Sequence, residues 1–495
     1  MNKLDEFAPI FYPQSHAIIG ASADVRKFSG RYLQTVLAFG FSGRLYPVNP
    51  QETEVLGLKS YPSVLDIPEP VDFATIVVPA RAVPKVAAEC LTKGVKGVQV
   101  LSAGFREVGP EGERLEKELG EIAAKGLRII GPNCFGVYSP DGGITILPGA
   151  NLPKDSGPVA FISQSGGYSI RMPRRGSGMG LRFSKVISYG NACDINECDL
   201  IEYLYQDPQT KIITGYIEGV KDGRRFFELL KEVCRTKPVI LWKGGLTKAG
   251  ARAVQSHTAS LGGGEEIWDA VFRQTGAVRV SGLEELLDTT LAFLQLQPES
   301  RGKASVIGGG GGIGVAAADI CERVGLSLEV FPTEVQKKLA SIVPPSGASV
   351  RNPVDVASPV PPAPMLKAVL ETIATEADVD ILIVDELEMA ARMLLPENEA
   401  EQAQVLTEGL AQVPVDIKAK SGKSVVMVMP VEAIGSDGIE SERDRRRISE
   451  FYFQHKIPVF MTIERAAKAL VNFISYHRRN ATMSSPSRQS VEVMP

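Results

Sequence analysis

His257 is the residue whose setting most clearly suggests chemistry, in a chain with only four histidines. It stands in Gln255-Ser256-His257-Thr258-Ala259-Ser260-Leu261-Gly262-Gly263-Gly264, a run of small residues typical of a loop that moves. A neutral imidazole is a good nucleophile, so this pattern favours a histidine that moves while it carries a chemical group. A histidine on a surface loop or at the cap of a helix fits the same residues.

Two glycine-rich turns elsewhere in the chain are typical of phosphate binding. Ser163-Gln164-Ser165-Gly166-Gly167 and the run from Gly308 to Gly314 each follow an apolar segment and precede a helical pattern. The N-terminus of a helix offers unpaired amide donors and about half a positive charge, so it attracts phosphate. Together with His257, the turns predict an enzyme that works through a phosphohistidine. The predicted phosphate ligands are Ser163, Gln164, Ser165, Gly166, Gly310, Gly311 and Gly312.

The composition indicates a multidomain globular protein. With 495 residues, 44% of them hydrophobic, the chain is too long for one core, and about three domains are expected. A net charge of -4 leaves no broad cationic surface for nucleic acid or anionic lipid. No signal segment or membrane-spanning run is recognisable, and the six scattered cysteines form no CxxC pair. We therefore expect a cytoplasmic protein without a metal site of its own, because Cys193 and Cys198 lack further ligands at zinc spacing.

Three series of short apolar runs alternate with helical patterns, which predicts an α/β fold with three parallel sheets. The expected domains span residues 1–145, 146–300 and 301–477, and a polar tail at 478–495 is expected to be disordered. Strands of the first domain are predicted at 17–20, 45–48, 73–78, 97–101 and 127–130. Those of the second lie at 159–162, 183–187, 212–217, 239–242 and 278–280. Those of the third lie at 304–307, 328–330, 379–384, 424–429 and 458–460.

The turn after the first strand is typical of nucleotide binding. The amides of Gly20-Ala21-Ser22 and the start of the next helix can receive a pyrophosphate, and Lys27 adds positive charge. A dinucleotide site would need G-x-G-x-x-G here and an acid after the second strand, where Val48-Asn49-Pro50 stands instead. The turn therefore predicts a nucleotide other than NAD, although a glycine turn that only connects strand to helix fits these residues too.

A series of short motifs gives the chain a family resemblance. In the first domain they are Ile18-Ile19-Gly20-Ala21-Ser22, Tyr46-Pro47-Val48-Asn49-Pro50, Val77-Val78-Pro79-Ala80, Ser102-Ala103-Gly104-Phe105 and Gly131-Pro132-Asn133-Cys134-Phe135-Gly136. In the later domains they are Ser163-Gln164-Ser165-Gly166, Tyr216-Ile217-Glu218-Gly219, Lys243-Gly244-Gly245, Ser256-His257-Thr258, the third-domain glycine run and Asn352-Pro353-Val354-Asp355. In this order, the set resembles the alpha subunit of the NDP-forming (ADP-forming) acyl-CoA synthetases, in the succinyl-CoA synthetase superfamily.

The resemblance implies an N-terminal Rossmann-like CoA-binding domain followed by two flavodoxin-like parallel-sheet domains of the succinyl-CoA synthetase type. The implied reaction interconverts acyl-CoA, phosphate and ADP with free acid, CoA and ATP, through an acyl phosphate and a phosphohistidine on His257. Glu218 matches the acceptor that fixes the imidazole ring, although by itself it fits a solvated loop acid. The implied CoA ligands are Gly20, Ala21, Ser22, Lys27, Val48, Asn49, Pro50, Val78, Pro79, Ser102, Ala103, Gly104 and Asn133.

The chain departs from the family in two places. No segment resembles an ATP-grasp domain, so the resemblance implies a hetero-oligomer with a beta subunit that holds ATP or ADP and Mg²⁺. Arg171, Arg174 and Arg175 stand where the family has an apolar helix, and either select an anionic acyl group or form a basic interface. Ile170 replaces a tyrosine of succinate-specific relatives, which argues against succinate. Cys134 fits packing, or a place beside the substrate, better than a nucleophile.

Two other functions are compatible with parts of the sequence. A CoA-binding regulatory protein could keep the fold and lose the activity, but it would need neither His257 nor Glu218. An NAD-dependent dehydrogenase is disfavoured by the missing acid after the second strand. The sequence does not identify the acyl group or the partner.

Overall fold

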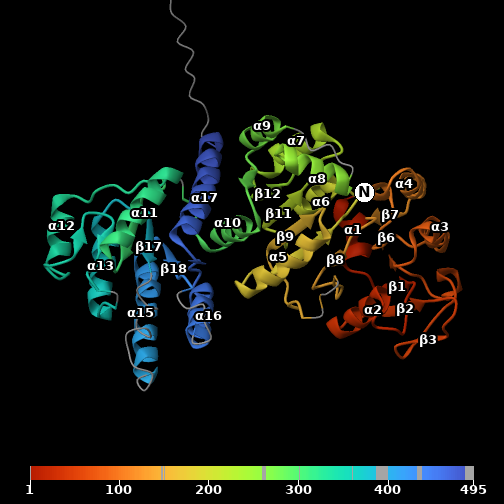
Figure 1. Cartoon of the computed structure of the whole chain (residues 1–495), viewed down its shortest axis with the longest axis horizontal. Helices are drawn as coiled ribbons and strands as arrows, with labels where there is room; N and C mark the ends of the chain where they lie inside the picture. The colour runs from red at the N-terminus through yellow and green to blue at the C-terminus, as the bar shows by residue number, and fades with distance from the viewer. Residues whose placement is uncertain are drawn as a thin grey trace, which may run out of the picture. The chain divides into compact units, whose positions relative to one another are not determined.

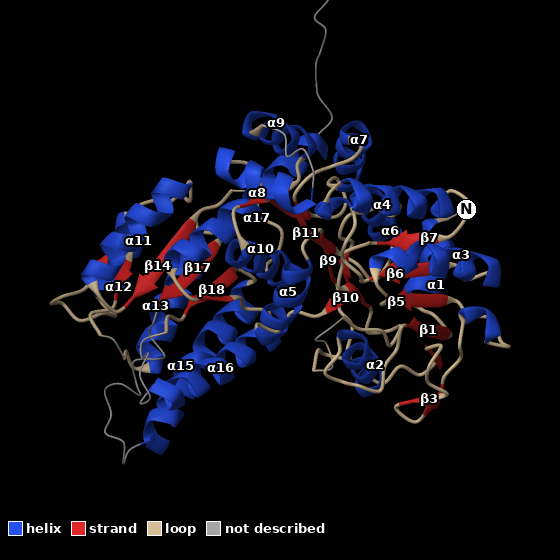
Figure 2. Ribbon diagram, turned by 45° about the vertical axis from the view of Figure 1, so that its right-hand side comes forward, coloured by secondary structure: helices blue, strands red, loops and turns tan. Residues whose placement is uncertain are grey.

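The computed structural model describes residues 2–146, 149, 151–258, 264–299, 301–358, 360–385, 400–431 and 438–484. It divides into two compact units, Met1–Leu286 and Leu287–Pro495 (Figure 1). The first unit contains two large sheets and the second contains one. Helices lie on both sides of the strand layers (Figure 2), so the predicted α/β class is confirmed.

The first sheet has the order β2-β1-β5-β6-β7, and all its neighbours are parallel. The five predicted strands are therefore confirmed, and their carboxyl ends share one edge. The strands are β1 (Ser15–Ile19), β2 (Arg44–Val48), β5 (Phe73–Ile76), β6 (Gly97–Val100) and β7 (Arg128–Ile130). The helices are α1 (Lys3–Phe11), α2 (Phe28–Phe39), α3 (Val83–Lys93) and α4 (Pro110–Ala123). The short pair β3 (Glu54–Val55) and β4 (Leu58–Lys59) was not predicted.

The second sheet has the order β13-β12-β11-β9-β10-β8. Its first strand, β8 (Gly136–Tyr138), pairs antiparallel with β10, so this sheet begins before the domain boundary predicted at 145. The other strands match the prediction: β9 (Val159–Ser163), β10 (Phe183–Ser188), β11 (Ile212–Ile217), β12 (Val239–Lys243) and β13 (Val278–Val280). The helices are α5 (Gly166–Gly178), α6 (Glu197–Gln206), α7 (Gly223–Val233), α8 (Lys248–Thr258) and α9 (Glu265–Thr275).

The third sheet, in the C-terminal unit, has the order β15-β16-β14-β17-β18-β19. Its strands are β14 (Ala304–Gly308), β15 (Ser349–Val350), β16 (Val354–Asp355), β17 (Ile381–Asp385), β18 (Ser424–Val428) and β19 (Val459–Phe460). Helix α10 (Leu283–Gln295) begins in the first unit and continues into this one. The other helices are α11 (Gly311–Val324), α12 (Thr333–Ala340), α13 (Ala363–Glu376), α15 (Ala400–Ser421), α16 (Ile439–Gln454) and α17 (Ile463–Ser484).

Two predictions for this unit are wrong. Residues 328–330 form no strand, because the Asn352 side-chain amide bonds the carbonyl oxygens of Ala304 and Glu329, at 3.0 Å each, where a strand pair would form. The position beside β14 belongs to β16 instead. The predicted tail also begins too early, since α17 continues to Ser484 and Arg478 donates to the carbonyl oxygen of Arg301 at 2.9 Å. Residues 485–495 lie outside the described part.

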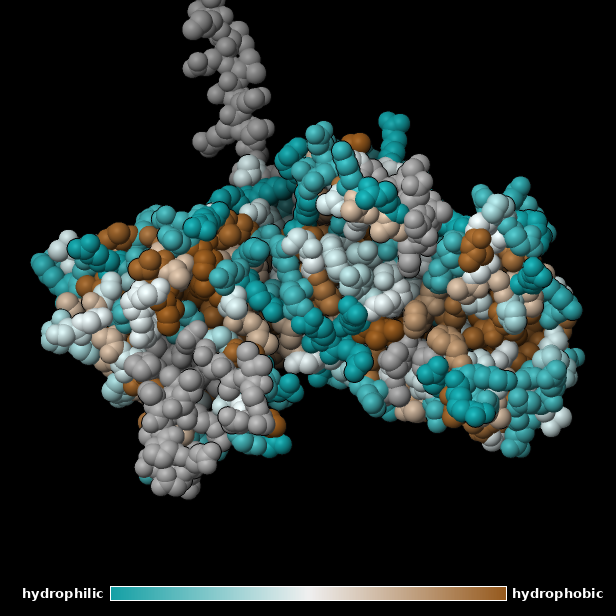
Figure 3. Space-filling model, viewed as in Figure 1, coloured by the Kyte–Doolittle hydropathy of each residue, from teal (hydrophilic) through white to brown (hydrophobic). Residues whose placement is uncertain are grey.

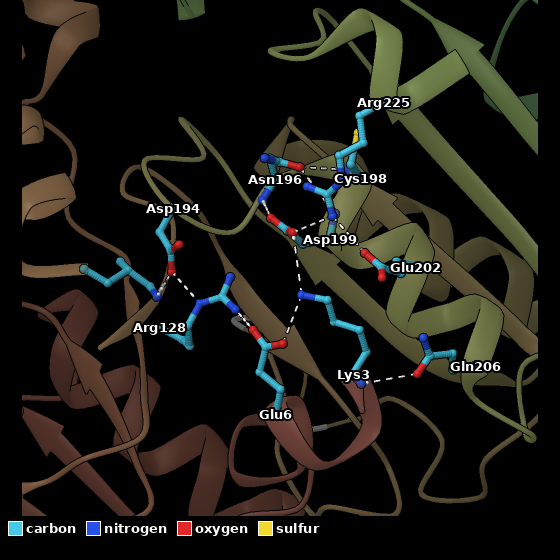
Figure 4. A network of polar contacts seen from close by, with 11 residues as sticks. Lys3, Glu6, Arg128, Asp194, Asn196, Cys198, Asp199, Glu202, Gln206 and Arg225 are labelled. Atoms are coloured by element: carbon cyan, nitrogen blue, oxygen red, sulfur yellow. Dashed lines mark hydrogen bonds and ion pairs between the residues drawn. The ribbon is translucent and has the colours of Figure 1, made fainter. Parts of the chain in front are cut away.

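Helix α1 is attached to both sheets of the first unit by ion pairs (Figure 4). Arg128 of β7 pairs with Glu6 and with Asp194, the second at 2.9 Å between Nε and Oδ2. Lys3 pairs with Glu6 at 2.9 Å and approaches Asp199 of α6 at 3.9 Å. These groups are partly exposed, so each pair contributes little by itself, and the main effect of the network is to fix the position of the helix.

The face of the molecule drawn in Figure 3 is mostly hydrophilic, with hydrophobic side chains grouped between the hydrophilic ones. Within the described residues, every helix is too short or too polar to cross a bilayer.

His16 is a buried residue of β1, and its burial makes the stability of the protein depend on pH in acid. Its Nε2 lies 2.7 Å from Thr75 Oγ1, and burial lowers its pKa from 6.5 to about 3. The neutral ring contributes stability that is complete above pH 6.5 and is lost as the pH falls towards 3. We expect the free energy of unfolding to lose up to about 1.4 kcal/mol per pH unit from this group. Denaturant unfolding of wild type and His16→Gln between pH 6.5 and 4 checks this, since equal slopes would contradict it.

Candidate active site

The predicted CoA ligands gather at the carboxyl edge of the first sheet, because each follows one of its parallel strands. Backbone and side-chain bonds connect neighbouring loops there. The Gly20 amide donates to the Val48 carbonyl at 2.9 Å, and Asn49 Nδ2 donates to the Ala21 carbonyl at 2.8 Å. The same edge continues through the bond from Ser102 Oγ to the Val78 carbonyl (2.6 Å) and that from the Asn133 amide to the Ser102 carbonyl (2.9 Å).

The turn at Gly20 packs closely against the loop after β5, and the helix that follows it begins with unbonded amides. Gly20 has φ +91°, and a Cβ atom there would clash with the Val77 carbonyl. Lys27 is the exposed N-cap of α2 and makes no side-chain capping bond, so the first amides of that helix are available to an anion. These features fit a bound pyrophosphate. Glu52 was missed by the sequence analysis, and its carboxylate holds the Ala23 amide at 3.3 Å and Asn49 Nδ2 at 3.2 Å.

The first predicted phosphate turn connects β9 to the N-terminus of α5. Ser165 is the N-cap of α5 and makes no side-chain capping bond, while Ser163 Oγ donates to the Ser165 carbonyl at 2.7 Å. Gly166 is the first helical residue and is partly exposed. The turn therefore presents helix amides that a phosphate can use.

Gln164 makes a contact that the prediction did not foresee. Its Oε1 accepts the amides of Glu218 and Gly219, the latter at 2.9 Å. In this structure the Gln164 oxygen braces the loop after β11. A phosphate would bind the Nε2 donor rather than this oxygen, so the phosphate role of Gln164 stays a prediction.

Phe135 joins the CoA edge to the phosphate turn. Its amide donates to Ser188 Oγ at 3.0 Å, and its ring lies edge-on to Phe28 with centroids 6.1 Å apart. A Cβ atom on Gly166 would overlap the Phe135 ring. The loop 131–135 and the start of α5 are therefore in direct contact, which brings the two halves of the predicted site together within one unit.

Glu218 is buried, with 5% of its surface exposed, at the carboxyl end of β11. It is not the solvated loop acid that its sequence alone allowed. Burial and the nearby Glu218 carboxylate raise the pKa of the Tyr216 hydroxyl. Lys243, at the end of β12, donates from Nζ to the Glu218 carbonyl at 2.8 Å. The predicted acceptor for the histidine thus lies beside the phosphate turn and is held from both neighbouring strands.

His257 belongs to helix α8, whereas the sequence analysis placed it at the head of a loop. Ala249, Ala251 and Ala253 favour a helix here, and Thr247 Oγ1 accepts the Gly250 amide at 3.0 Å near its start. Helix α8 lies against the short helix η3 (Arg106–Val108). Helix η3 begins two residues after Gly104, one of the predicted CoA ligands. The His257 side chain and residues 259–263 lie outside the described part.

The second glycine turn belongs to the C-terminal unit. Gly310 is the N-cap of α11, and Gly311 and Gly312 are exposed. Two buried carboxylates lie beside this turn: Asp355, which the sequence analysis named only as part of a motif, and Asp385, which it did not name. A Cβ atom on Gly311 would be 3.5 Å from Asp355 Oδ2, and one on Gly308 would be 3.7 Å from the Asp385 Cβ. Carboxylates at the edge weaken the attraction of this helix end for phosphate.

The three arginines of α5 lie on the surface of the helix. Arg171, Arg174 and Arg175 are exposed, opposite the buried side of α5, and Arg175 pairs with Glu284 at 2.7 Å. This arrangement agrees with a basic surface and gives no direct support to an acyl site.

Burial raises the pKa of the Cys134 thiol to about 12, so the thiol stays protonated. This supports a packing role for Cys134 rather than a role as nucleophile.

Comparisons with known proteins identify the same three parts. Family models match as a CoA binding domain at residues 14–140, a succinyl-CoA ligase like flavodoxin domain at 156–293 and a ligase-CoA domain at 304–482. The alpha subunit of ADP-forming acetate–CoA ligase I of Pyrococcus furiosus is 44% identical over 355 residues, which is 70% of this chain and 76% of that one. ADP-forming acetate–CoA ligase I of Archaeoglobus fulgidus is 40% identical over 76% of this chain, which spans 54% of that protein.

A solved structure agrees over nearly the whole chain. Acetyl-coenzyme A synthetase 1 of Candidatus Korarchaeum cryptofilum, in complex with phosphate and ADP, gives a TM-score of 0.80 at 32% identity. The match covers 99% of this chain and 100% of that one. The protein therefore belongs to the family of ADP-forming acyl-CoA synthetases, in the succinyl-CoA synthetase superfamily.

Proposed function

We propose that this chain is the alpha-type subunit of an ADP-forming acyl-CoA synthetase. It interconverts acyl-CoA, phosphate and ADP with a carboxylic acid, CoA and ATP. The observation that carries the proposal is the contact between Phe135 and Gly166, which sets the CoA edge directly against the N-terminus of α5. A thioester bound at that edge can then meet a phosphate bound at the turn.

The reaction divides into three displacements. Phosphate attacks the thioester carbonyl, CoA leaves as a thiolate, and an acyl phosphate forms. The His257 imidazole then attacks phosphorus and the carboxylate leaves. Finally a terminal ADP oxygen attacks the phosphohistidine, giving ATP and free imidazole. The first two steps place negative charge on oxygens beside Ser165 and Gly166, where helix amides stabilise it without losing protons.

The nucleophilic ring needs one nitrogen aimed at phosphorus while the other donates to a fixed acceptor. Glu218 is the proposed acceptor, since it is buried beside the turn and fixed through its backbone. Helix α8 lies against η3 next to the CoA edge, which supports a place for His257 near this site; its exchange with a nucleotide elsewhere is part of the proposal. The second turn, at Gly310 to Gly312, is proposed as a phosphate-binding turn of the C-terminal unit, despite the nearby carboxylates.

The nucleotide site is proposed to lie on a partner. A separate ATP-grasp beta subunit would hold ADP or ATP together with Mg²⁺. The relatives named as alpha subunits are consistent with a two-chain enzyme. The active form would then be a hetero-oligomer in the cytoplasm.

Mixing the protein with a candidate ATP-grasp subunit, acetyl-CoA, phosphate, ADP and Mg²⁺ tests the proposal. Acetyl-CoA is the probe because the named relatives are acetate–CoA ligases. We expect ATP and free CoA in equal amounts, and no reaction if either protein or phosphate is omitted. CoA binding without ATP formation, with every related ATP-grasp subunit of the source genome, would instead favour the regulatory CoA-binding protein.

A further inference from the structure

The backbone of Glu218 is held from both sides by the side chains of neighbouring strands. In the sheet, β11 lies between β9 and β12, and Glu218 follows directly after β11. From the β9 side, Gln164 Oε1 accepts the Glu218 amide and the Gly219 amide, the latter at 2.9 Å. From the β12 side, Lys243 Nζ donates to the Glu218 carbonyl at 2.8 Å. Both polar groups of this one residue's main chain are therefore bonded to side chains.

Lys243 has an unusual setting for a lysine. Only 4% of its surface is exposed, its Nζ also donates to the Gly244 carbonyl, and it lies 5.0 Å from the centre of the Trp268 ring. Burial lowers its pKa to about 8, while the Glu218 carboxylate acts in the opposite direction. A methionine would fill the same space without the cost of desolvating a charge. We therefore expect the Lys243 ammonium group to have a role other than filling space in the core.

We propose that Lys243, together with Gln164, is a positioning residue that holds Glu218 where it can orient His257, and that Lys243 acts in its charged form. This inference rests on the proposed function. A displacement of about 1 Å in a catalytic group can cost about 100-fold in rate, so a backbone fixed from both flanking strands has a clear benefit.

The proposal predicts a characteristic pH dependence. Glu218 is the charged group acting on Lys243 from the β11 side, and α9 presents the neutral Trp268 ring. As the pH rises through about 8, Lys243 loses its proton and the rate of His257 phosphorylation should fall. Its effect on folding has the opposite sign. Because its folded pKa is lowered, its contribution to stability is present above pH 10.5 and is lost as the pH falls through about 8. A falling rate above pH 8 therefore cannot come from unfolding driven by this group.

Lys237 offers a matched control at the other end of the same strand. It stands just before β12 and donates from Nζ to the carbonyls of Leu204, at 3.0 Å, and Asp207, at 2.7 Å. Burial lowers its pKa as well. A lysine that only ties loops together is thus present in the same domain, away from the candidate site.

The test measures the rate of phosphohistidine formation between pH 6.5 and 9.5, with ATP labelled in its γ-phosphoryl group, Mg²⁺ and the ATP-grasp subunit. For Lys243→Met we expect a rate about 10- to 100-fold below wild type and no fall near pH 8. For Lys243→Arg we expect most of the rate to return, without a fall near pH 8, because guanidinium does not titrate there. Lys237→Met should keep the wild-type rate and pH profile.

Three results would overturn the inference: a wild-type rate and pH profile in Lys243→Met, an arginine variant no faster than the methionine variant, or the same loss in Lys237→Met. If Lys243→Met does not fold, Gln164→Leu provides the second measurement, since it removes the other side of the support and should slow labelling similarly. A wild-type protein that takes no label on histidine contradicts the proposed function itself. A labelled wild type with an undisturbed Lys243→Met contradicts only the role of Lys243.

Discussion

His257→Ala is expected to abolish the label that γ-labelled ATP leaves on the protein in the presence of Mg²⁺ and the ATP-grasp subunit. In wild type this label should be stable in base and lost in acid, as a phosphoryl group on imidazole nitrogen is. Alanine has no nucleophile, and the loss of a covalent intermediate should reduce turnover by at least about 1,000-fold. Folding should change little, because alanine supports a helix at least as well as histidine at this position of α8.

His455→Ala is the matched control for that experiment. His455 is exposed at the end of α16, in the C-terminal unit, and its Nδ1 lies 2.8 Å from the Phe451 carbonyl oxygen. Its removal should leave both the label and its chemical stability unchanged. Label retained by His257→Ala would show that another group accepts the phosphoryl, and the three-step scheme would then be wrong. Thermal unfolding of both variants separates loss of chemistry from loss of folding.

The sequence predicted most of the fold because its signals are local. Apolar runs bounded by glycine and proline located all five strands of the first sheet. A parallel sheet then places the residues after those strands at one edge, so Gly20, Asn49, Ser102 and Asn133, which the family resemblance named as CoA ligands, lie on the same side of the sheet. The failures occurred where a side chain replaced a strand. Asn352 takes the place of a pairing partner for residue 329, and no local pattern of residues 328–330 reveals that.

The site was less predictable than the fold, because its roles depend on contacts between distant residues. Gln164 belongs to a phosphate-binding motif, yet its oxygen faces amides that lie 54 and 55 residues further along the chain. The sequence analysis named Lys243 only as part of a motif. Its proposed role depends on its burial and on its hydrogen bond to the Glu218 carbonyl, 25 residues away, and neither can be read from neighbouring residues. Asp355 was named in a motif, but no local pattern placed it beside the second turn. Asp385 is the last residue of β17, where many strands carry an acid, so its position there did not single it out.

Gly166→Ala is expected to reduce phosphohistidine formation from acyl-CoA and phosphate by about 100-fold, although the substitution adds a single carbon. Alanine normally favours a helix by up to about 1 kcal/mol over glycine. Here the new Cβ atom would overlap the Phe135 ring, which is itself packed against Phe28. Either the ring moves, and the CoA edge moves with it, or the start of α5 retreats from the thioester. The clash should therefore cost about 1–3 kcal/mol of stability as well as rate.

Gly178→Ala is the control, because Gly178 is the last residue of the same helix and a Cβ atom there meets no described atom within 4 Å. It should keep the wild-type rate and stay within about 0.5 kcal/mol in stability. Phosphorylation of His257 from ATP uses the partner's nucleotide and no thioester, so Gly166→Ala should impair it less than the reaction from acyl-CoA. Equal losses in the two directions would mean that Gly166 serves the phosphoryl group alone. No loss in either direction would contradict the proposed coupling of the CoA edge to the phosphate turn through Phe135.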